Sequence, residues 1–205
     1  MSIVINGSGS ISGLAVGGLP DGTVDAGTLA TNSVDSAELI DGAVDDSHMA
    51  AMAASKLSGT VATARMPTGS VLQVVQGSTG TAVESTSVSY ADTGLSASIT
   101  PSSTSSKILV RVHQNGGLKE AAGSGVLVQL YRGSTVLTKL THAAGYNNVN
   151  QVAYLGAIST EYLDSPSTAS AVTYKTQFAN NQAISSSHLQ VGSTTSFITL
   201  MEIAG

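Results

Sequence analysis

The sequence predicts an all-β protein in two parts, with an extended repetitive segment followed by a compact β domain. Two observations predict this arrangement. A ten-residue repeat occupies the first third of the chain, and short β-rich runs separated by Gly, Ser, Asn and Pro occupy the rest. Only 10% of the 205 residues are charged, 22 are Gly and none is Trp, which is typical of β structure stabilised by backbone hydrogen bonds and by contacts between chains. We divide the chain into an N-terminal segment (1–20), a stalk (21–69) and a head (70–205).

The formal charge of −5 lies entirely in the first part of the chain. Residues 1–69 hold seven acidic and two basic side chains, whereas residues 70–205 hold six of each. A chain without a basic patch is not expected to bind nucleic acid. Cysteine is absent, which excludes a disulfide framework and a thiol nucleophile. No signal segment or membrane-spanning run is recognised, so we expect folding in a cytoplasm and no membrane insertion.

The stalk is predicted from three decads in register, each with Val followed by Asp and then, four residues later, by Leu or Met. Side chains spaced five residues apart do not lie on one face of a continuous helix, and they do not lie on one face of a continuous strand. An extended Val-Asp step followed by one helical turn fits better, and Asp35-Ser-Ala-Glu38 has capping-box spacing. The apolar positions are Val24, Leu29, Val34, Leu39, Val44 and Met49.

One such thread cannot bury its own apolar residues, so we expect these six positions to pack against further copies of the chain. Three parallel copies are the natural closed arrangement, although the repeat itself does not fix that number. The alternative is a flexible linker with accidental periodicity. In an oligomer Asp25, Asp35 and Asp45 would form carboxylate rings able to bind a cation, with His48 nearby. The simpler interpretation is that each Asp caps its turn and faces water, so we predict no metal and no cofactor.

The head is predicted to be a β-sandwich or jelly roll, because β-rich runs fill it and no segment has helical periodicity. Arg132-Gly-Ser134 predicts a tight hairpin between two of the runs. The predicted strands are 71–76, 83–90, 95–100, 107–113, 126–131, 135–141, 152–158, 171–178 and 197–203.

Some of these strands are apolar on both faces. Residues 108, 110 and 112 fill one side of one run, while Leu109 lies on the other; Leu127 and Tyr131 similarly oppose an apolar side in another run. A sandwich needs only one buried face per strand. We therefore interpret Leu109, Leu127 and Tyr131 as candidate contacts between subunits, the alternative being a thicker packing within one chain.

Several segments resemble the tail-fibre and appendage proteins of marine phages, cyanophages in particular. The opening Ser2-Ile-Val-Ile-Asn-Gly-Ser-Gly resembles their N-terminus, and the Val-Asp-x-x-x-Leu decads resemble their shaft repeats. Gly69-Ser-Val-Leu-Gln-Val-Val-Gln76, Asp92–Pro101 and Phe197–Gly205 resemble their C-terminal head. The resemblance implies a parallel homotrimer on a virion, with residues 1–20 on another virion protein and the head outward. It also implies binding to a host-surface glycan or protein. The alternative is a head fibre, decoration or linking segment with a purely structural role.

If the head binds a receptor, its exposed loops are the expected contact sites. The favoured loop, 141–151, offers Tyr146 as a platform for a sugar ring and three amides as hydrogen-bonding groups. Two other loops are candidates, 114–125 and 179–183, the second continuing to His188. The candidate receptor-binding residues are His142, Tyr146, Asn147, Asn148 and Asn150.

No catalytic arrangement is recognised in the sequence. The acidic residues of the head are scattered, and Glu161 and Asp164 are interpreted as part of a solvated turn before Pro166. No Gly-x-Ser-x-Gly segment is followed by a suitably ordered acid and His. We therefore expect a protein that is not an enzyme.

Overall fold

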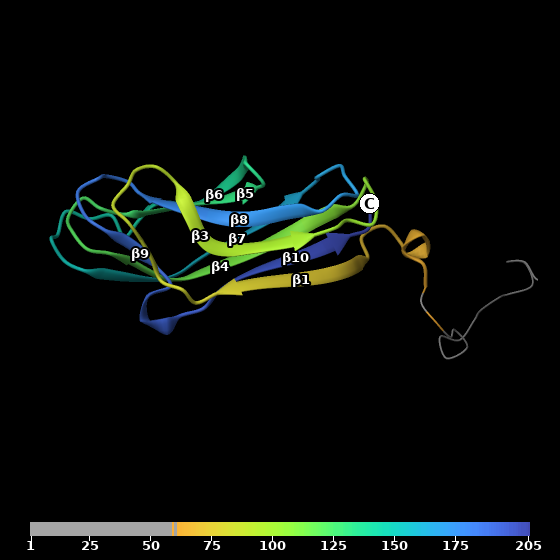
Figure 1. Cartoon of the computed structure of the whole chain (residues 1–205), viewed down its shortest axis with the longest axis horizontal. Helices are drawn as coiled ribbons and strands as arrows, with labels where there is room; N and C mark the ends of the chain where they lie inside the picture. Colours follow the sequence, from red (N-terminus) through yellow and green to blue (C-terminus); the bar gives the residue numbers. More distant parts are fainter. Residues whose placement is uncertain (1–58, 60) are drawn as a thin grey trace, which may run out of the picture. The chain divides into compact units, whose positions relative to one another are not determined.

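The computed structural model of this chain describes residue 59 and residues 61–205, and Thr60–Gly205 form one compact unit. The stalk positions Val24, Leu29, Val34, Leu39, Val44 and Met49 lie outside the described residues. Regular structure in the described part is β, apart from two short 3-10 turns, η3 (Thr63–Arg65) and η4 (Val191–Ser193) (Figure 1). The ten strands are β1 Val71–Thr79, β2 Val83–Ser85, β3 Ala91–Ile99, β4 Lys107–Lys119, β5 Val126–Arg132, β6 Thr135–Ala144, β7 Ala153–Asp164, β8 Val172–Asn180, β9 Ser187–Leu189 and β10 Ser196–Ile203.

The predicted all-β class is confirmed for the residues that the structure describes, and each predicted run overlaps a strand. The run 83–90 is wrong in extent, because β2 ends at Ser85. The amide of Ser87 bonds Ser85 Oγ at 3.1 Å and the amide of Ser89 bonds Ser87 Oγ at 2.9 Å. Such local serine-to-backbone bonds offer the chain an alternative to strand pairing.

The turn predicted around Glu161 and Asp164 is also wrong, because β7 continues through both residues as Ala153–Asp164. Glu161 pairs across the sheet with Arg111, and Asp164 pairs with Ile108. Ladder pairing along the whole of β4 therefore overrides the turn preference of the Asp-Ser-Pro sequence. No membrane-spanning helix is found among the residues that the structure describes.

The strands form two antiparallel sheets whose four long pairings are nested. β1 pairs with β10, β3 with β8, β4 with β7, and β5 with β6. In this nesting each pair of strands lies inside the previous pair along the chain, as in one long antiparallel hairpin folded over into two layers. This is the strand order of a jelly roll. Sheet A has the order β1-β10-β4-β7, extended by the short β9 and β2 along the β4 edge. Sheet B has the order β3-β8-β5-β6 (Figure 1).

The core lies between the two sheets and consists of two apolar clusters. Their side chains come from alternate positions along the strands, because every second residue of a strand faces inward. The larger cluster comprises Leu95, Ala97, Ile99, Ile108, Val110, Val112, Leu130, Tyr174, Ile198 and Leu200. The smaller comprises Val126, Val128, Ile158, Phe178 and Leu189. Leu140 on β6 packs against both.

Buried polar side chains also join the two sheets. Thr93 Oγ1 lies 2.6 Å from Thr176 Oγ1, and Thr176 Oγ1 donates to Gln114 Oε1 at 2.9 Å. Gln114 Nε2 donates to Ser196 Oγ at 3.1 Å, as does Gln190 Nε2 at 3.2 Å. Because a strand slipped by one residue would leave these buried groups unpaired, the network stabilises one register of β3 and β8 against β4 and β10.

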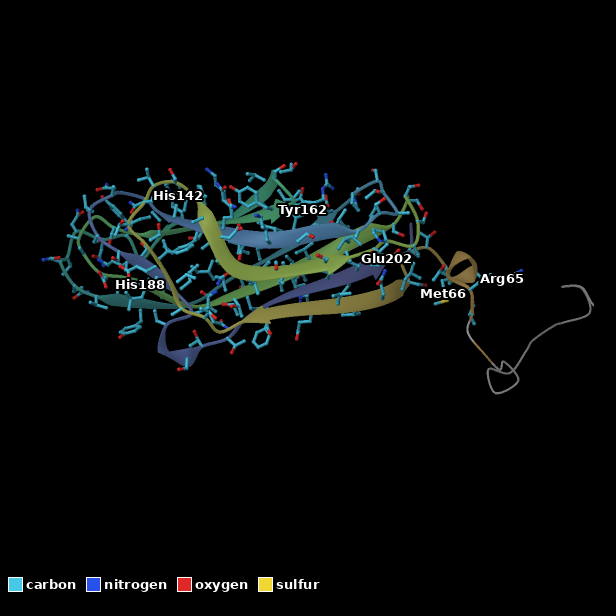
Figure 2. All side chains as sticks on the ribbon, viewed as in Figure 1. Arg65, Met66, His142, Tyr162, His188 and Glu202 are labelled. Atoms are coloured by element: carbon cyan, nitrogen blue, oxygen red, sulfur yellow. The ribbon has the colours of Figure 1, made fainter. Side chains whose placement is uncertain are left out.

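One end of the sandwich, here the proximal end, holds the incoming segment and the C-terminus. Met66 and Glu202 mark this end, whereas His142 and His188 mark the opposite, distal end (Figure 2). The amide of Gly69 bonds the Ala204 carbonyl at 2.8 Å, and the amide of Ala204 bonds the Ser70 carbonyl at 2.8 Å. The chain therefore enters β1 beside the last residues of β10.

Candidate functional site

The three loops predicted as candidate contact sites lie together at the distal end. The predicted ranges 114–125, 141–151 and 179–183 begin too early, because β4, β6 and β8 continue into them, and His142 lies on β6. The loops themselves are the segments 120–125, 145–152 and 181–186, here called the distal loops. The amide of Gly123 bonds the Asn147 carbonyl at 2.7 Å, and Asn181 Nδ2 bonds the Gly123 carbonyl at 3.2 Å. The amide of Asn181 also bonds the Gly125 carbonyl at 3.0 Å. The sequence named the loops separately, and these bonds tie them into one surface.

A buried lysine at the end of β4 stabilises the distal loops. Lys119, the last residue of β4, is fully buried, and its ammonium group donates to Asn147 Oδ1 at 2.7 Å. It also donates to the Ala121 carbonyl at 3.0 Å and the Val149 carbonyl at 3.2 Å. A buried ammonium needs such acceptors because the interior cannot hydrate it. Lys119 thus fixes the loop 120–125 and the loop 145–152 relative to the end of β4.

The candidate receptor residues divide into two groups. His142, Tyr146, Asn148 and Asn150 are exposed, and the Tyr146 side chain is 50% exposed. Asn147 has an internal role instead, because its Oδ1 accepts bonds from Lys119 and from the amide of Val149. The structure therefore leaves four of the five predicted residues available at the surface and uses the fifth to shape the loop.

Other residues of the distal end were not among the candidate receptor-binding residues. His188 Nε2 lies 2.9 Å from Glu120 Oε1, which connects β9 to the loop 120–125. Ile184, Val149 and Val152 are exposed apolar side chains on the distal loops or beside them. A surface that combines an exposed tyrosine, amides and apolar side chains can contact both the ring faces and the hydroxyls of a sugar.

A pocket of about 420 Å³ lies where β4 and β7 bulge beside η4. Asn115, Tyr154, Gly156, Val191 and Thr194 are among its lining residues, and Tyr154 is 77% exposed. A Cβ at Gly116, which has φ of +62°, would contact Thr194 Oγ1 and approach the backbone nitrogen of Val191 to 2.6 Å. The pocket therefore depends on glycine at 116, and the sequence did not predict it, because 114–125 was interpreted only as a contact loop.

A second pocket, of about 320 Å³, lies at the proximal end and is lined by serines. Ser102, Ser103, Ser105 and Ser106 line it together with Met66. Ser106 is buried beside this pocket at 2% exposure. The neighbouring Glu202 carboxylate is occupied by Ser102 and Gln73.

The carboxylates considered for catalysis do not share a site. Glu161 lies on the outward face of β7 and pairs with Arg111, with a distance of 2.6 Å between Nε and Oε1. Asp164 is buried, accepting a bond from Arg132 Nη1 at 2.7 Å and one from the Tyr174 hydroxyl at 2.7 Å. Burial, together with the adjacent Asp164, raises the pKa of the Tyr174 hydroxyl. Within the described residues no group of three His, Asp or Glu side chains could hold a metal ion.

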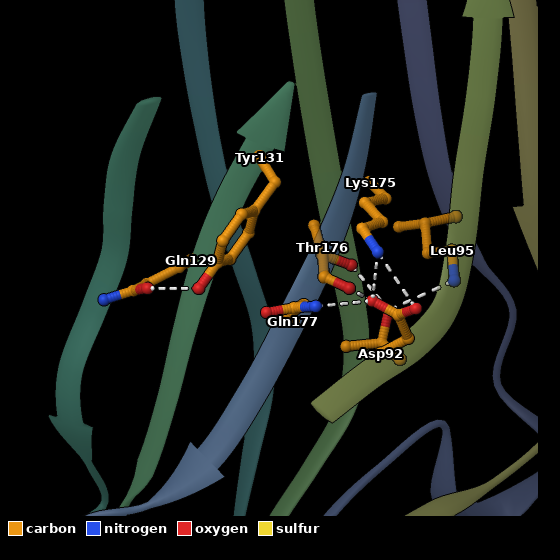
Figure 3. Close-up of polar contacts among 8 residues, drawn as sticks. Asp92, Leu95, Gln129, Tyr131, Lys175, Thr176 and Gln177 are labelled. Carbon is orange, nitrogen blue, oxygen red and sulfur yellow. Dashed lines mark hydrogen bonds and ion pairs between the residues drawn. The ribbon is translucent and has the colours of Figure 1, made fainter. Parts of the chain in front are cut away.

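The three candidate interface residues of the head lie on two different faces. Leu109 is on the outer face of sheet A, between Leu163 and Met201. Leu127 and Tyr131 are on β5 in sheet B, where the Tyr131 hydroxyl bonds Gln129 Oε1 at 3.0 Å (Figure 3). The structure therefore does not bring Leu109 together with the other two.

Comparisons with known proteins do not place this chain in a family. No protein-family model matches the chain, and no curated protein matches its sequence. Among solved structures, the VP2 subviral particle of infectious bursal disease virus is similar, with a TM-score of 0.38 and 11% identity. The match covers 66% of this chain and 34% of that one, so the chain spans about a third of the length of VP2. A likeness at this level says nothing of function.

Proposed function

We propose that this chain is a subunit of a homo-oligomeric fibre on a phage particle, and that its distal loops bind a host-surface glycan. The observation that carries the proposal is the position of the loops. All three lie at the end of the sandwich opposite the end where residues 61–70 enter β1 (Figures 1 and 2). A head attached through its N-terminal side would present these loops outward.

The chemistry of the loops supports a glycan rather than a nucleic acid or a membrane. Their exposed groups include an aromatic ring, amides, apolar side chains and the Glu120 carboxylate, and the head as a whole carries six acidic and six basic residues. Sugar rings stack their CH faces on aromatic side chains, and their hydroxyls bond amides. Single sugar contacts are weak, and several heads on one fibre would strengthen them through effective concentration.

Binding of labelled full-length protein to a panel of marine bacteria, cyanobacteria included, tests the proposal. The double variant Tyr146→Ala, Asn148→Ala is expected to bind at least about tenfold more weakly, as removal of central aromatic contacts usually does. Polysaccharide purified from a bound host is expected to compete with the cells. The matched control is Ser134→Ala, Thr135→Ala, which changes two exposed residues of the β5–β6 hairpin.

Equal binding by the two double variants would overturn the assignment of the distal loops. A wild-type protein that assembles with the same mass but binds no cell in the panel would favour the structural alternative, a linking or decorating segment without a receptor. Competition by host surface protein instead of polysaccharide would exclude the glycan and leave adhesion standing.

A further inference from the structure

The outer faces of the two sheets differ in chemistry. The central cross-strand row of sheet B is polar, with Lys139, Gln129, Gln177 and Asp92 side by side on four strands. Asp92 bonds Gln177 at 2.8 Å and Lys175 at 2.9 Å, and these bonds, that from Lys175 first, lower its pKa (Figure 3). The row is polar throughout, with Lys139 and Asp92 exposed at its two ends and Gln129 buried at 7% exposure between them.

Sheet A has an apolar row at the corresponding place. Leu163 on β7 pairs with Leu109 on β4, Leu109 pairs with Met201 on β10, and Met201 pairs with Val74 on β1. Val71 and Ile203 lie in a second row toward the proximal end, in which Ile203 also pairs with Lys107. Val74 is 56% exposed and Leu163 is 52% exposed in the single chain. We call Leu163, Leu109, Met201 and Val74 the apolar row.

We infer that the apolar row of sheet A packs against the same sheet of a second copy of this chain. Exposed apolar side chains gathered on the outer face of a sheet mark a candidate contact surface. The inference rests on the proposed homo-oligomeric fibre, and it names the surface through which the heads associate.

The order of apolar and polar rows along the outer face of sheet A favours a second copy of this chain over an unrelated partner protein. Next to the apolar row lies a polar row of Glu161, Arg111, Thr199 and Gln76, and then a row containing His113 and Phe197. Each row runs perpendicular to the strands. If parallel copies of the chain surround an axis that runs along the strands, each row of one copy lies at the same position along that axis as the same row of the next copy. Apolar rows then meet apolar rows, and the Arg111–Glu161 pair of one copy meets that of the next, where both signs of charge are available.

The outer face of sheet A supplies part of the area that such a contact needs. Four strands spaced by roughly 4.8 Å, over seven residues rising roughly 3.4 Å each, give a face of roughly 500 Å² before side-chain relief is counted. A stable interface buries about 800 Å² per partner. The outer face of one sheet therefore supplies more than half of the area of a standard interface. If the decads of the copies associate, the residues before β1 in each chain add further buried area.

Cysteine labelling in the full chain tests this inference, because the natural chain has no cysteine. Val74→Cys places a thiol on the apolar row, and Val136→Cys places one on β6 of sheet B. The two valines are similarly exposed in a single chain, at 56% and 47%. We expect Val74→Cys in the native protein to react with a maleimide at least about tenfold more slowly than Val136→Cys, and both to react equally in denaturant. A short bismaleimide is expected to link two chains at position 74 and not at 136.

A pair of charge variants gives a second readout. Met201→Asp is expected to reduce the mass or the thermal midpoint of the assembly, whereas Ser98→Asp on the outer face of sheet B is expected to change neither. An oligomer in which positions 74 and 136 react equally fast would overturn the inference and leave the proposed fibre intact. Slow reaction at 74 without interchain linkage, in a chain of monomeric mass, would show that the chain covers its own face. That result would overturn both proposals.

Discussion

Glu202 is a fully buried carboxylate whose charge is balanced by hydrogen-bond donors. Its Oε1 accepts bonds from the amide and the hydroxyl of Ser102, both at 2.6 Å, and its Oε2 accepts one from Gln73 Nε2 at 2.6 Å. Burial alone raises the pKa of this carboxyl, but the bonds from Ser102 and Gln73 outweigh burial and hold the pKa below its ordinary value of 4.5. Glu202 thus ties β10 to β1 and to the loop after β3.

We expect Glu202→Gln to lower the free energy of unfolding by about 2 kcal/mol at pH 7, because one accepting oxygen becomes a donor that faces other donors. The folded pKa is depressed, so the stability contributed by the carboxylate is present above the unfolded pKa and is lost as pH falls through the folded pKa. The difference between wild type and variant is therefore expected to shrink as pH falls from the unfolded pKa through the folded pKa of Glu202. Urea unfolding as a function of pH measures it.

Asp92→Asn is the matched control for this carboxyl-to-amide change. Asp92 also has a lowered pKa, but its side chain is exposed and its partner Lys175 is at the surface. A surface ion pair contributes about 0 to 1 kcal/mol, so the loss at pH 7 is expected to be smaller than that for Glu202→Gln. Equal losses for the two variants would contradict the role assigned to burial at Glu202.

Asn147 and Asn148 show what a sequence can and cannot predict at the residue scale. Both are asparagines in a polar loop, and sequence reasoning gave them the same role. In the folded chain Asn147 Oδ1 accepts a hydrogen bond from the Lys119 ammonium group, while the Asn148 side chain is exposed. The distinction depends on Lys119, which is 28 residues away in sequence, and no local pattern encodes that contact.

We expect Asn147→Ala to destabilise the distal loops, because the buried Lys119 ammonium loses its side-chain acceptor, at an expected loss of about 1 to 3 kcal/mol. Limited proteolysis is expected to cut the loop 145–152 of this variant faster than that of the wild type. Asn148→Ala, at the neighbouring exposed position, is expected to be cut at the wild-type rate. If both variants were cut equally fast, the anchoring role of Lys119 would be wrong.

At the scale of elements, the long strands were predictable and the irregular ones were not. Alternating or continuous apolar runs indicated β4, β5, β8 and β10, since each buries a face in the core. β9 was missed because Ser187-His-Leu189 has no alternation, and it forms only because β4 and β2 provide pairing edges. Tertiary pairing likewise extended β7 through residues that favour a turn.

The bulge of β4 offers a test of close packing between elements. Gly116→Ala is expected to lower the free energy of unfolding by about 3 kcal/mol or more, because φ is +62° and the new Cβ would meet Thr194 and Val191 of the η4 segment. Gly156→Ala is the control, since φ is +67° there and no atom lies within 4 Å of the Cβ position. That variant is expected to lose only the backbone term of about 1 to 2 kcal/mol. Denaturant unfolding of both variants measures the difference, and equal losses would contradict close packing of η4 on Gly116.

At the scale of the whole molecule, nested strand pairing places the N-terminal entry at one end of the sandwich and three loops at the other. The sequence predicted the sandwich and named these loops, but it did not predict that they would meet or that the two outer faces would differ. Those properties depend on register, which brings Leu163, Leu109, Met201 and Val74 into one row from four strands. The same geometry underlies the proposed fibre, with the distal loops outward and sheet A between copies.

The mass of the full-length chain in solution tests the central claim most directly. Size-exclusion chromatography with light scattering is expected to give three times the chain mass of 20.5 kDa, with the early elution of an elongated particle. A mass of 20.5 kDa with the elution of a compact protein would contradict the account. The apolar residues of the decads and the apolar row of sheet A would then have no partner chain, and the proposed homo-oligomeric fibre would be wrong.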